Sequence, residues 1–144
     1  MARRTFAIRN LRPGRPDPAT AGRYLLAWHS PALYTQPAAF PRISSPALFG
    51  DDRPLHLDIG CGTGELVCAL AAIDPDGNYL GVDSSLKSLH VAVAQAQARE
   101  LRGVRFIWAQ IQGLYPLLAP GALAAVTLHF PDPCLHAKER HRLV

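Results

Sequence analysis

A glycine-rich stretch near the middle of the chain is bounded by acidic residues. In the sequence DIGCGTGE, Asp58 precedes the first glycine by two positions and Glu65 follows the last one directly. Gly60, Gly62 and Gly64 allow turns with positive φ and a close approach of the backbone to a ligand. Two carboxylates would repel a pyrophosphate, but they would attract an ammonium or a sulfonium group. S-adenosylmethionine carries both of these groups, so the stretch predicts contacts of Asp58 and the three glycines with that cofactor.

Two further polar residues, Asp83 and Gln110, each follow an expected strand. Asp83 can accept hydrogen bonds from a ribose diol, and the Gln110 amide can donate to and accept from an adenine edge. Nicotinamide sites share the ribose contact, but their G-x-G-x-x-G pattern is one residue longer than the spacing found here. A nicotinamide oxidoreductase is therefore the least favoured function. Alternatively, the glycine-rich stretch binds no ligand and is only a turn that joins a strand to a helix, where Glu65 offsets the helix dipole.

Another carboxylate, Asp132, lies between Pro131 and Pro133 in the sequence FPDPC. The prolines restrict the backbone on both sides, so the carboxylate is held with little freedom. It can accept hydrogen bonds from the N1–H and 2-amino groups of guanine, and it favours the positive charge that develops when a purine accepts a methyl cation. Because N7 has a free lone pair, this transfer needs no general base. The alternative role for Asp132 is to cap a turn.

Apolar runs alternate with turn signals from Pro54 onward, and this pattern predicts the elements that position these residues. Buried strands are expected over residues 54–60, 78–82, 104–108 and 124–130. One helix is expected over 65–73, and a second begins after a cap at Ser84 or Ser85 and ends near Gly103. One helical turn is expected within 110–121, and a short helical stretch over 19–28. Strands that alternate with helices imply a parallel sheet with right-handed crossovers. In such sheets the ligand lies beyond the carboxyl ends of the strands, where all the residues above fall.

Composition excludes several other classes of protein. No apolar run approaches the roughly 18 residues that a membrane helix needs, so we expect a cytoplasmic protein without membrane contact. The three cysteines form no C-x-x-C pair, and the histidines are scattered. Neither a disulfide framework nor a metal site is therefore expected. Cys61 and Cys68 are interpreted as small core or loop residues and not as nucleophiles.

Charge and proline content divide the chain into two parts. Residues 1–53 form an arginine- and proline-rich N-terminal arm, and residues 54–144 contain the alternating strands and helices. Residues 1–50 carry seven arginines against Asp17, about +6, whereas 51–129 carry five basic and eight acidic residues, about −3. An acidic centre between basic ends suits a cationic cofactor and an anionic partner such as RNA. Ordinary surface charge is the alternative explanation.

Three segments, LDIGCGTGE, DPDGNYLGVDSS and LHFPDPCLHAKERHRLV, resemble the bacterial tRNA (guanine-N7)-methyltransferases. That family has an acid and glycine loop, a second strand that ends in an acid, and a strand that ends F-P-D-P-W before a basic segment. The resemblance covers about residues 54–144, and the F-P-D-P match with its basic sequel is its most specific part. It implies a class I, Rossmann-like α/β methyltransferase fold with a parallel sheet, S-adenosylmethionine as the cofactor and tRNA as the substrate.

The resemblance also assigns roles to individual residues. It implies that Asp58, Asp83 and the position of Gln110 contact the cofactor, and that Asp132 is the catalytic aspartate and is also expected to contact the cofactor. His136 or Lys138 falls where a lysine contacts the tRNA. The chain departs from the family at two of these positions, where Gln110 replaces an aspartate and His136 a lysine, and at Cys134, which replaces a tryptophan.

The family's sequence continues past the position of Val144, so we expect a sheet that is incomplete after its fourth strand. Three functions remain open at this point. The first is methyl transfer to N7 of guanine in tRNA, with arginines of the arm and Lys138 on the phosphates. The second keeps S-adenosylmethionine but changes the substrate to a small molecule. The third is a truncated, non-catalytic module that binds RNA. The oligomeric state cannot be predicted.

Overall fold

The computed structural model describes residues 14–128. Its five strands are β1 (Leu25–Ala27), β2 (Leu55–Ile59), β3 (Asn78–Asp83), β4 (Val104–Trp108) and β5 (Leu123–Leu128). Its α-helices are α1 (Pro18–Tyr24), α2 (Ala32–Thr35), α3 (Ser45–Phe49), α4 (Glu65–Ile73), α5 (Leu86–Ala98) and α6 (Ile111–Leu114). Two 3-10 turns, η2 (Pro37–Ala39) and η3 (Tyr115–Leu117), complete the elements.

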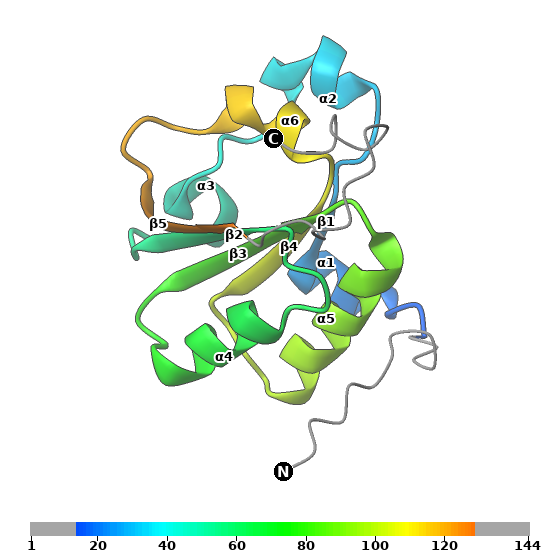
Figure 1. Cartoon of the computed structure of the whole chain (residues 1–144), viewed down its shortest axis with the longest axis vertical. Coiled ribbons are helices and arrows are strands. Elements are labelled where there is room, and N and C mark those ends of the chain that lie inside the picture. Colours follow the sequence, from blue (N-terminus) through cyan, green and yellow to red (C-terminus); the bar gives the residue numbers. More distant parts are fainter. Residues whose placement is uncertain (1–13, 129–144) are drawn as a thin grey trace, which may run out of the picture.

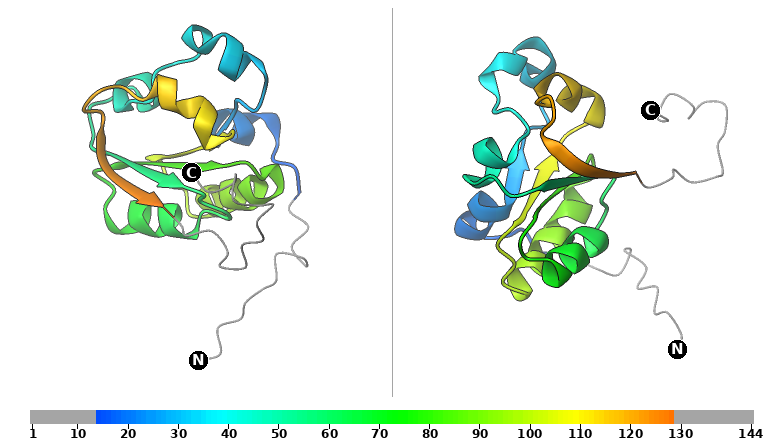
Figure 2. Two further views of the ribbon diagram at one scale, coloured as in Figure 1. Left: turned by 45° about the horizontal axis from the view of Figure 1, so that its top comes forward. Right: turned by 90° about the vertical axis from the view of Figure 1, so that its left-hand side faces the viewer.

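The strands form one sheet in the order β1-β4-β3-β2-β5, and every pair of neighbours is parallel. Helices α1, α4 and α5 cover one face, while α2, α3 and α6 lie over the other (Figures 1 and 2). This α/β architecture confirms the predicted parallel sheet. It places the carboxyl ends of the central strands at one edge, where ligands of such sheets bind.

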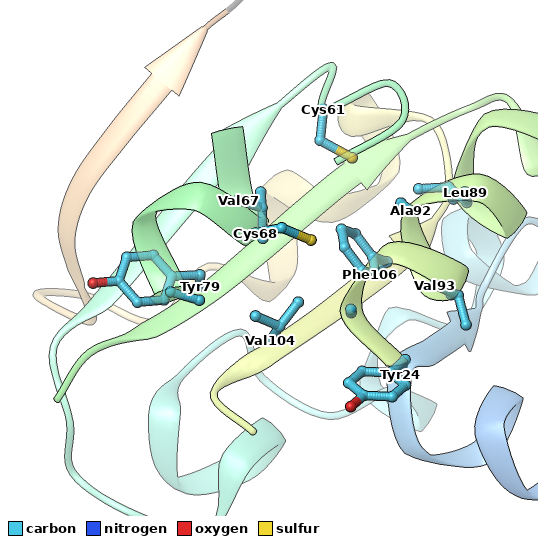
Figure 3. Close-up of a cluster of buried hydrophobic side chains, with 12 residues drawn as sticks. Tyr24, Cys61, Val67, Cys68, Tyr79, Leu89, Ala92, Val93, Val104 and Phe106 are labelled. Atoms are coloured by element: carbon cyan, nitrogen blue, oxygen red, sulfur yellow. The ribbon is translucent and has the colours of Figure 1, made fainter. Parts of the chain in front are cut away.

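Two hydrophobic clusters fill the space on either side of the sheet. Phe106, which is completely buried, packs with Ala92 and Leu89 of α5 and with Cys68 of α4 (Figure 3). The neighbouring residue Ile107 belongs to the cluster on the opposite face. Successive residues of a strand point to opposite faces, so a strand covered on both sides needs apolar residues throughout. This is the physical basis of the apolar runs in the sequence.

The N-terminal part of the described chain contributes to this sheet. The helical stretch expected over 19–28 is wrong in its second half, because α1 ends at Tyr24 and the next three residues form β1. Asp17 caps α1 by accepting from the Thr20 amide at 2.9 Å. At the other end, Leu25 pairs with Phe106 of β4. Pairing with β4, which makes β1 an edge strand of the sheet, therefore overrides the local helical preference.

The helices and strands predicted beyond Pro54 are confirmed as far as Leu128, with one wrong boundary, and the last two residues of the strand expected over 124–130 lie outside the described residues. Ser85 caps α5 by accepting from the Ser88 amide at 3.2 Å, but the helix ends at Ala98 and not near Gly103. Gly103 serves another purpose, since a Cβ there would lie 2.7 Å from the Gly77 carbonyl oxygen. Within residues 14–128, no helix has the length and apolar character needed to span a membrane.

Candidate functional site

The carboxyl ends of β2, β3 and β4 meet at one edge of the sheet. The glycine loop follows β2, Asp83 ends β3, and Gln110 lies two residues beyond the end of β4. The Ala109 amide donates to the Asp83 carbonyl at 3.1 Å, which ties the last two segments together. The structure therefore brings the glycine loop, Asp83 and Gln110, which the sequence predicted as cofactor contacts, to the same edge of the sheet.

The glycine loop folds back over the end of β3. Gly60, Gly62 and Gly64 have φ angles of 74°, 57° and 77°, a region that side chains disfavour. The amides of Gly60 and Cys61 both donate to the Val82 carbonyl, at 2.8 and 3.0 Å. Gly64 also has no room for a side chain, because a Cβ there would lie 2.8 Å from that of Ala92. The loop is thus held tightly between β3 and α5.

The Asp83 carboxylate is fixed by two backbone amides. Its Oδ2 accepts from Gly62 and its Oδ1 from Ser85, both at 2.8 Å. A carboxylate oxygen can accept more than one hydrogen bond, so each oxygen retains capacity for a ligand hydroxyl. Asp83 is half-buried. A half-buried carboxylate with a fixed orientation beside a glycine loop is well suited to hold a diol.

Asp58 is completely buried, and it lies behind the glycine loop. Its Oδ1 accepts a hydrogen bond of 2.6 Å from the Thr127 hydroxyl of β5. Thr127 also lies 3.2 Å from His56 Nε2. No sequence pattern predicted this polar contact of the strand residue His56, because 71 residues separate it from Thr127.

Two other side chains support the site without having been predicted. Gln95 of α5 donates to the Thr63 carbonyl at 2.9 Å and so braces the glycine loop. Trp108 donates to the Ser84 carbonyl at 3.0 Å, and the exposed His29 ring stacks on it with centroids 4.8 Å apart and an interplanar angle of 12°. The sequence could have indicated a role for Gln95, because it is a polar residue on the side of α5 that faces the protein interior. No pattern in the sequence indicated the ring stack.

The two cysteines of the described chain lie in the core, as predicted. Burial raises the pKa of the Cys61 thiol well above its ordinary value, and the Asp83 and Asp58 carboxylates raise it further. Burial also raises the pKa of Cys68. A thiolate is the reactive form of cysteine, so neither residue is suited to act as a nucleophile. Among the described residues, no cluster of histidine, cysteine and acidic side chains could hold a metal ion.

The remaining predicted site residues, Asp132, His136 and Lys138, lie outside the described residues, as does Cys134. Their assigned roles therefore stay predictions. The described part of the chain contains the glycine loop and three polar positions: Asp58 in β2, Asp83 at the end of β3 and Gln110 beyond β4.

Comparisons with known proteins agree with this geometry. A family model described as "Putative methyltransferase" matches residues 52–144. A protein of Rubrobacter xylanophilus is 51% identical over 142 residues, covering 99% of this chain and 63% of its own length. One of Chloroherpeton thalassium is 39% identical over 129 residues, covering 90% and 57%. Both are named tRNA (guanine-N(7)-)-methyltransferase.

The similarity to solved structures supports the fold. The structure of PKMT2 from Rickettsia typhi in complex with AdoHcy matches with a TM-score of 0.51 and 19% identity, over 83% of this chain and 22% of that one. This chain spans about three fifths of the length of the two curated relatives, 63% and 57%. The family model matches well over half of the chain. The chain therefore belongs to this methyltransferase family.

Proposed function

We propose that this chain is the cofactor-binding part of an S-adenosylmethionine-dependent methyltransferase that acts on N7 of guanine in tRNA. The observation that carries the proposal is the Asp83 carboxylate, which is held by the amides of Gly62 and Ser85 directly against the glycine loop. The curated relatives named for this activity support the choice of substrate.

The described residues fit S-adenosylmethionine. Asp83 would accept hydrogen bonds from the ribose hydroxyls, and the exposed Gln110 would face the adenine edge. The glycine loop would let the backbone approach the ligand, while Asp58 supplies negative charge behind it for the amino group. When bound, the cofactor supplies an electrophilic methyl group on a sulfonium sulfur. The side chains would hold it in a fixed position relative to the carboxyl edge of the sheet.

The substrate would be recognised by residues that follow β5 and by arginines of the N-terminal arm. Asp132 would accept hydrogen bonds from N1–H and the 2-amino group of guanine and would stabilise the positive charge that develops on the ring. His136 and Lys138 would contact the phosphates of tRNA, together with arginines of the N-terminal arm, residues 1–53. Because tRNA is the substrate, we place the protein in the cytoplasm.

Calorimetric titration with S-adenosylhomocysteine tests the cofactor site. The variant Asp83→Asn should weaken binding roughly tenfold or more, since an amide nitrogen would face the donating amide of Gly62 or Ser85. Asp76→Asn is the matched control, because Asp76 is an exposed acid in the turn that precedes β3. Equal affinities of the wild type and Asp83→Asn, or no binding by the wild type, would contradict the proposed site.

Methyl transfer from radiolabelled S-adenosylmethionine to unmodified tRNA tests the reaction. The product should cleave at the modified guanine after borohydride and aniline treatment, and Asp132→Asn should remove the signal while cofactor affinity stays within a few-fold. Transfer to a small molecule but not to tRNA would favour the second function. Salt-dependent tRNA binding with no transfer would favour a non-catalytic RNA-binding module.

A further inference from the structure

A chain of hydrogen bonds links β2 and β5 behind the glycine loop. Thr127 Oγ1 lies 2.6 Å from Asp58 Oδ1 and 3.2 Å from His56 Nε2. The strands are parallel, and Asp58 pairs directly with Thr127 in their register. His56 and Asp58 are two residues apart on β2, so their side chains lie on the same face of the sheet. The three side chains therefore form one connected group on the face covered by α4.

The direction of these hydrogen bonds follows from the number of protons available. A threonine hydroxyl has one proton, and the short distance to a buried carboxylate indicates that Thr127 donates it to Asp58, as in charge-assisted hydrogen bonds of about 2.5–2.7 Å. Thr127 Oγ1 must then be the acceptor from His56, which requires a proton on Nε2. The group is thus ordered from His56 to Thr127 to Asp58.

This order gives Thr127 a specific mechanical role. Asp58 has no exposed surface, so its carboxylate needs hydrogen-bond donors from the protein, and Thr127 is one of them. Thr127 is a β-branched residue with few accessible rotamers, and it lies in the part of β5, Ala125 to Leu128, that pairs with β2 without interruption. His56 in turn lies beside the Tyr79 ring, with centroids 6.0 Å apart. A stiff side chain on a paired strand can hold the carboxylate in one orientation.

We propose that Thr127, oriented by His56, is a positioning residue that fixes the Asp58 carboxylate for the amino group of S-adenosylmethionine. The inference rests on the proposed function, because it assumes that Asp58 acts on that cofactor. It adds a residue of β5, outside the glycine loop and the acid positions, to the determinants of cofactor affinity. Thr127 does not itself contact the cofactor.

The test compares Thr127→Val, which keeps the shape and loses the hydroxyl, with Thr127→Ser, which keeps the hydroxyl. Calorimetry with S-adenosylhomocysteine, at a temperature where every variant is folded, should show affinity about tenfold lower for Thr127→Val and close to wild type for Thr127→Ser. His56→Leu should show a smaller loss, and His56→Gln, which retains a donor, should recover much of it.

A merely structural role would lower the unfolding midpoint of Thr127→Val but leave its affinity for S-adenosylhomocysteine unchanged, and this result would overturn the inference. Nitrogen-15 NMR of the His56 ring gives a second readout that does not need the ligand: the proton should be on Nε2 in the wild type, and that preference should relax in Thr127→Val. A ring protonated only on Nδ1 in the wild type would also overturn the inference. Failure of the wild type to bind the ligand would instead reject the proposed function on which it depends.

Discussion

At the scale of single residues, the packing around Cys61 determines its chemistry. Cys61 lies at the start of the glycine loop, and a Cβ placed on Gly81 would come within 2.8 Å of its sulfur. The glycine in β3 therefore makes room for the thiol, and the loop can pack directly on the strand. The same burial that makes this contact possible keeps the thiol neutral, with Asp83 and Asp58 adding to the effect. A residue in a ligand loop can thus be structural even though its neighbours are functional.

This environment predicts how stability depends on pH. The pKa of Cys61 is raised in the folded state, whereas in the unfolded chain it has its ordinary value of 9.0. Above about pH 9 the unfolded state loses this proton and the folded state keeps it, so the free energy of unfolding should fall as pH rises, by up to about 1.4 kcal/mol per pH unit. Urea unfolding of Cys61→Ala should show a shallower alkaline decline than the wild type.

The comparison of slopes separates this effect from the loss of packing in Cys61→Ala. Any change in packing shifts the whole curve, whereas the proton linkage changes only its slope above pH 9. Every other ionisable group is present in both proteins, so the difference between the two slopes reports on Cys61. Parallel curves for the two proteins would show that the Cys61 thiol is not perturbed.

At the scale of elements, the sequence predicted what depends on local pattern and missed what depends on distant pairing. The strands β2 to β5 appear in the sequence as apolar runs, and the helices α4 and α5 have apolar residues at helical spacing. The order of these elements along the chain was enough to place the glycine loop and Asp83 at the carboxyl edge of the sheet. In contrast, β1 has only three residues and is a strand because it pairs with β4. The Thr127–Asp58 and Gln95–Thr63 contacts span 69 and 32 residues, so they required the folded structure.

Arg105 of β4 connects the sheet to the helices α1 and α3, which lie within residues 14–53. Arg105 donates to the Leu48 carbonyl of α3 at 2.9 Å and to the Gly22 carbonyl of α1 at 3.1 Å. Arg105→Met keeps the aliphatic length but removes both hydrogen bonds, so we expect a loss of about 1–3 kcal/mol in the free energy of unfolding. Hydrogen exchange of the α1 and α3 amides should accelerate more than that of α5.

The matched control is Arg102→Met, because Arg102 is exposed and lies just before β4. This change should leave both stability and exchange near their wild-type values. If Arg105→Met were equally silent, the hydrogen bonds to α1 and α3 would contribute nothing measurable. The segment from residue 14 to residue 53 would then be held by packing and by the β1–β4 pairing alone.

At the scale of the whole molecule, the described sheet is unevenly covered. Its centre is buried on both faces, but Val126 and Leu128 of β5 are 52% and 54% exposed. They are two residues apart and so share a face of the strand. Within residues 14–128, β5 has a strand partner only on its β2 side. An apolar edge strand with an open side tends to pair with other chains.

We therefore expect this edge to drive self-association of the 144-residue chain. Sedimentation velocity should show a concentration-dependent increase in mass for the wild type, and the double variant Val126→Lys with Leu128→Lys should shift the chain toward the monomer, because charge on an edge strand opposes pairing. Ile73→Lys is the control, since Ile73 is 80% exposed at the end of α4 and is not part of this edge. Association that responds equally to both changes would mean that general surface hydrophobicity, and not the β5 edge, is responsible.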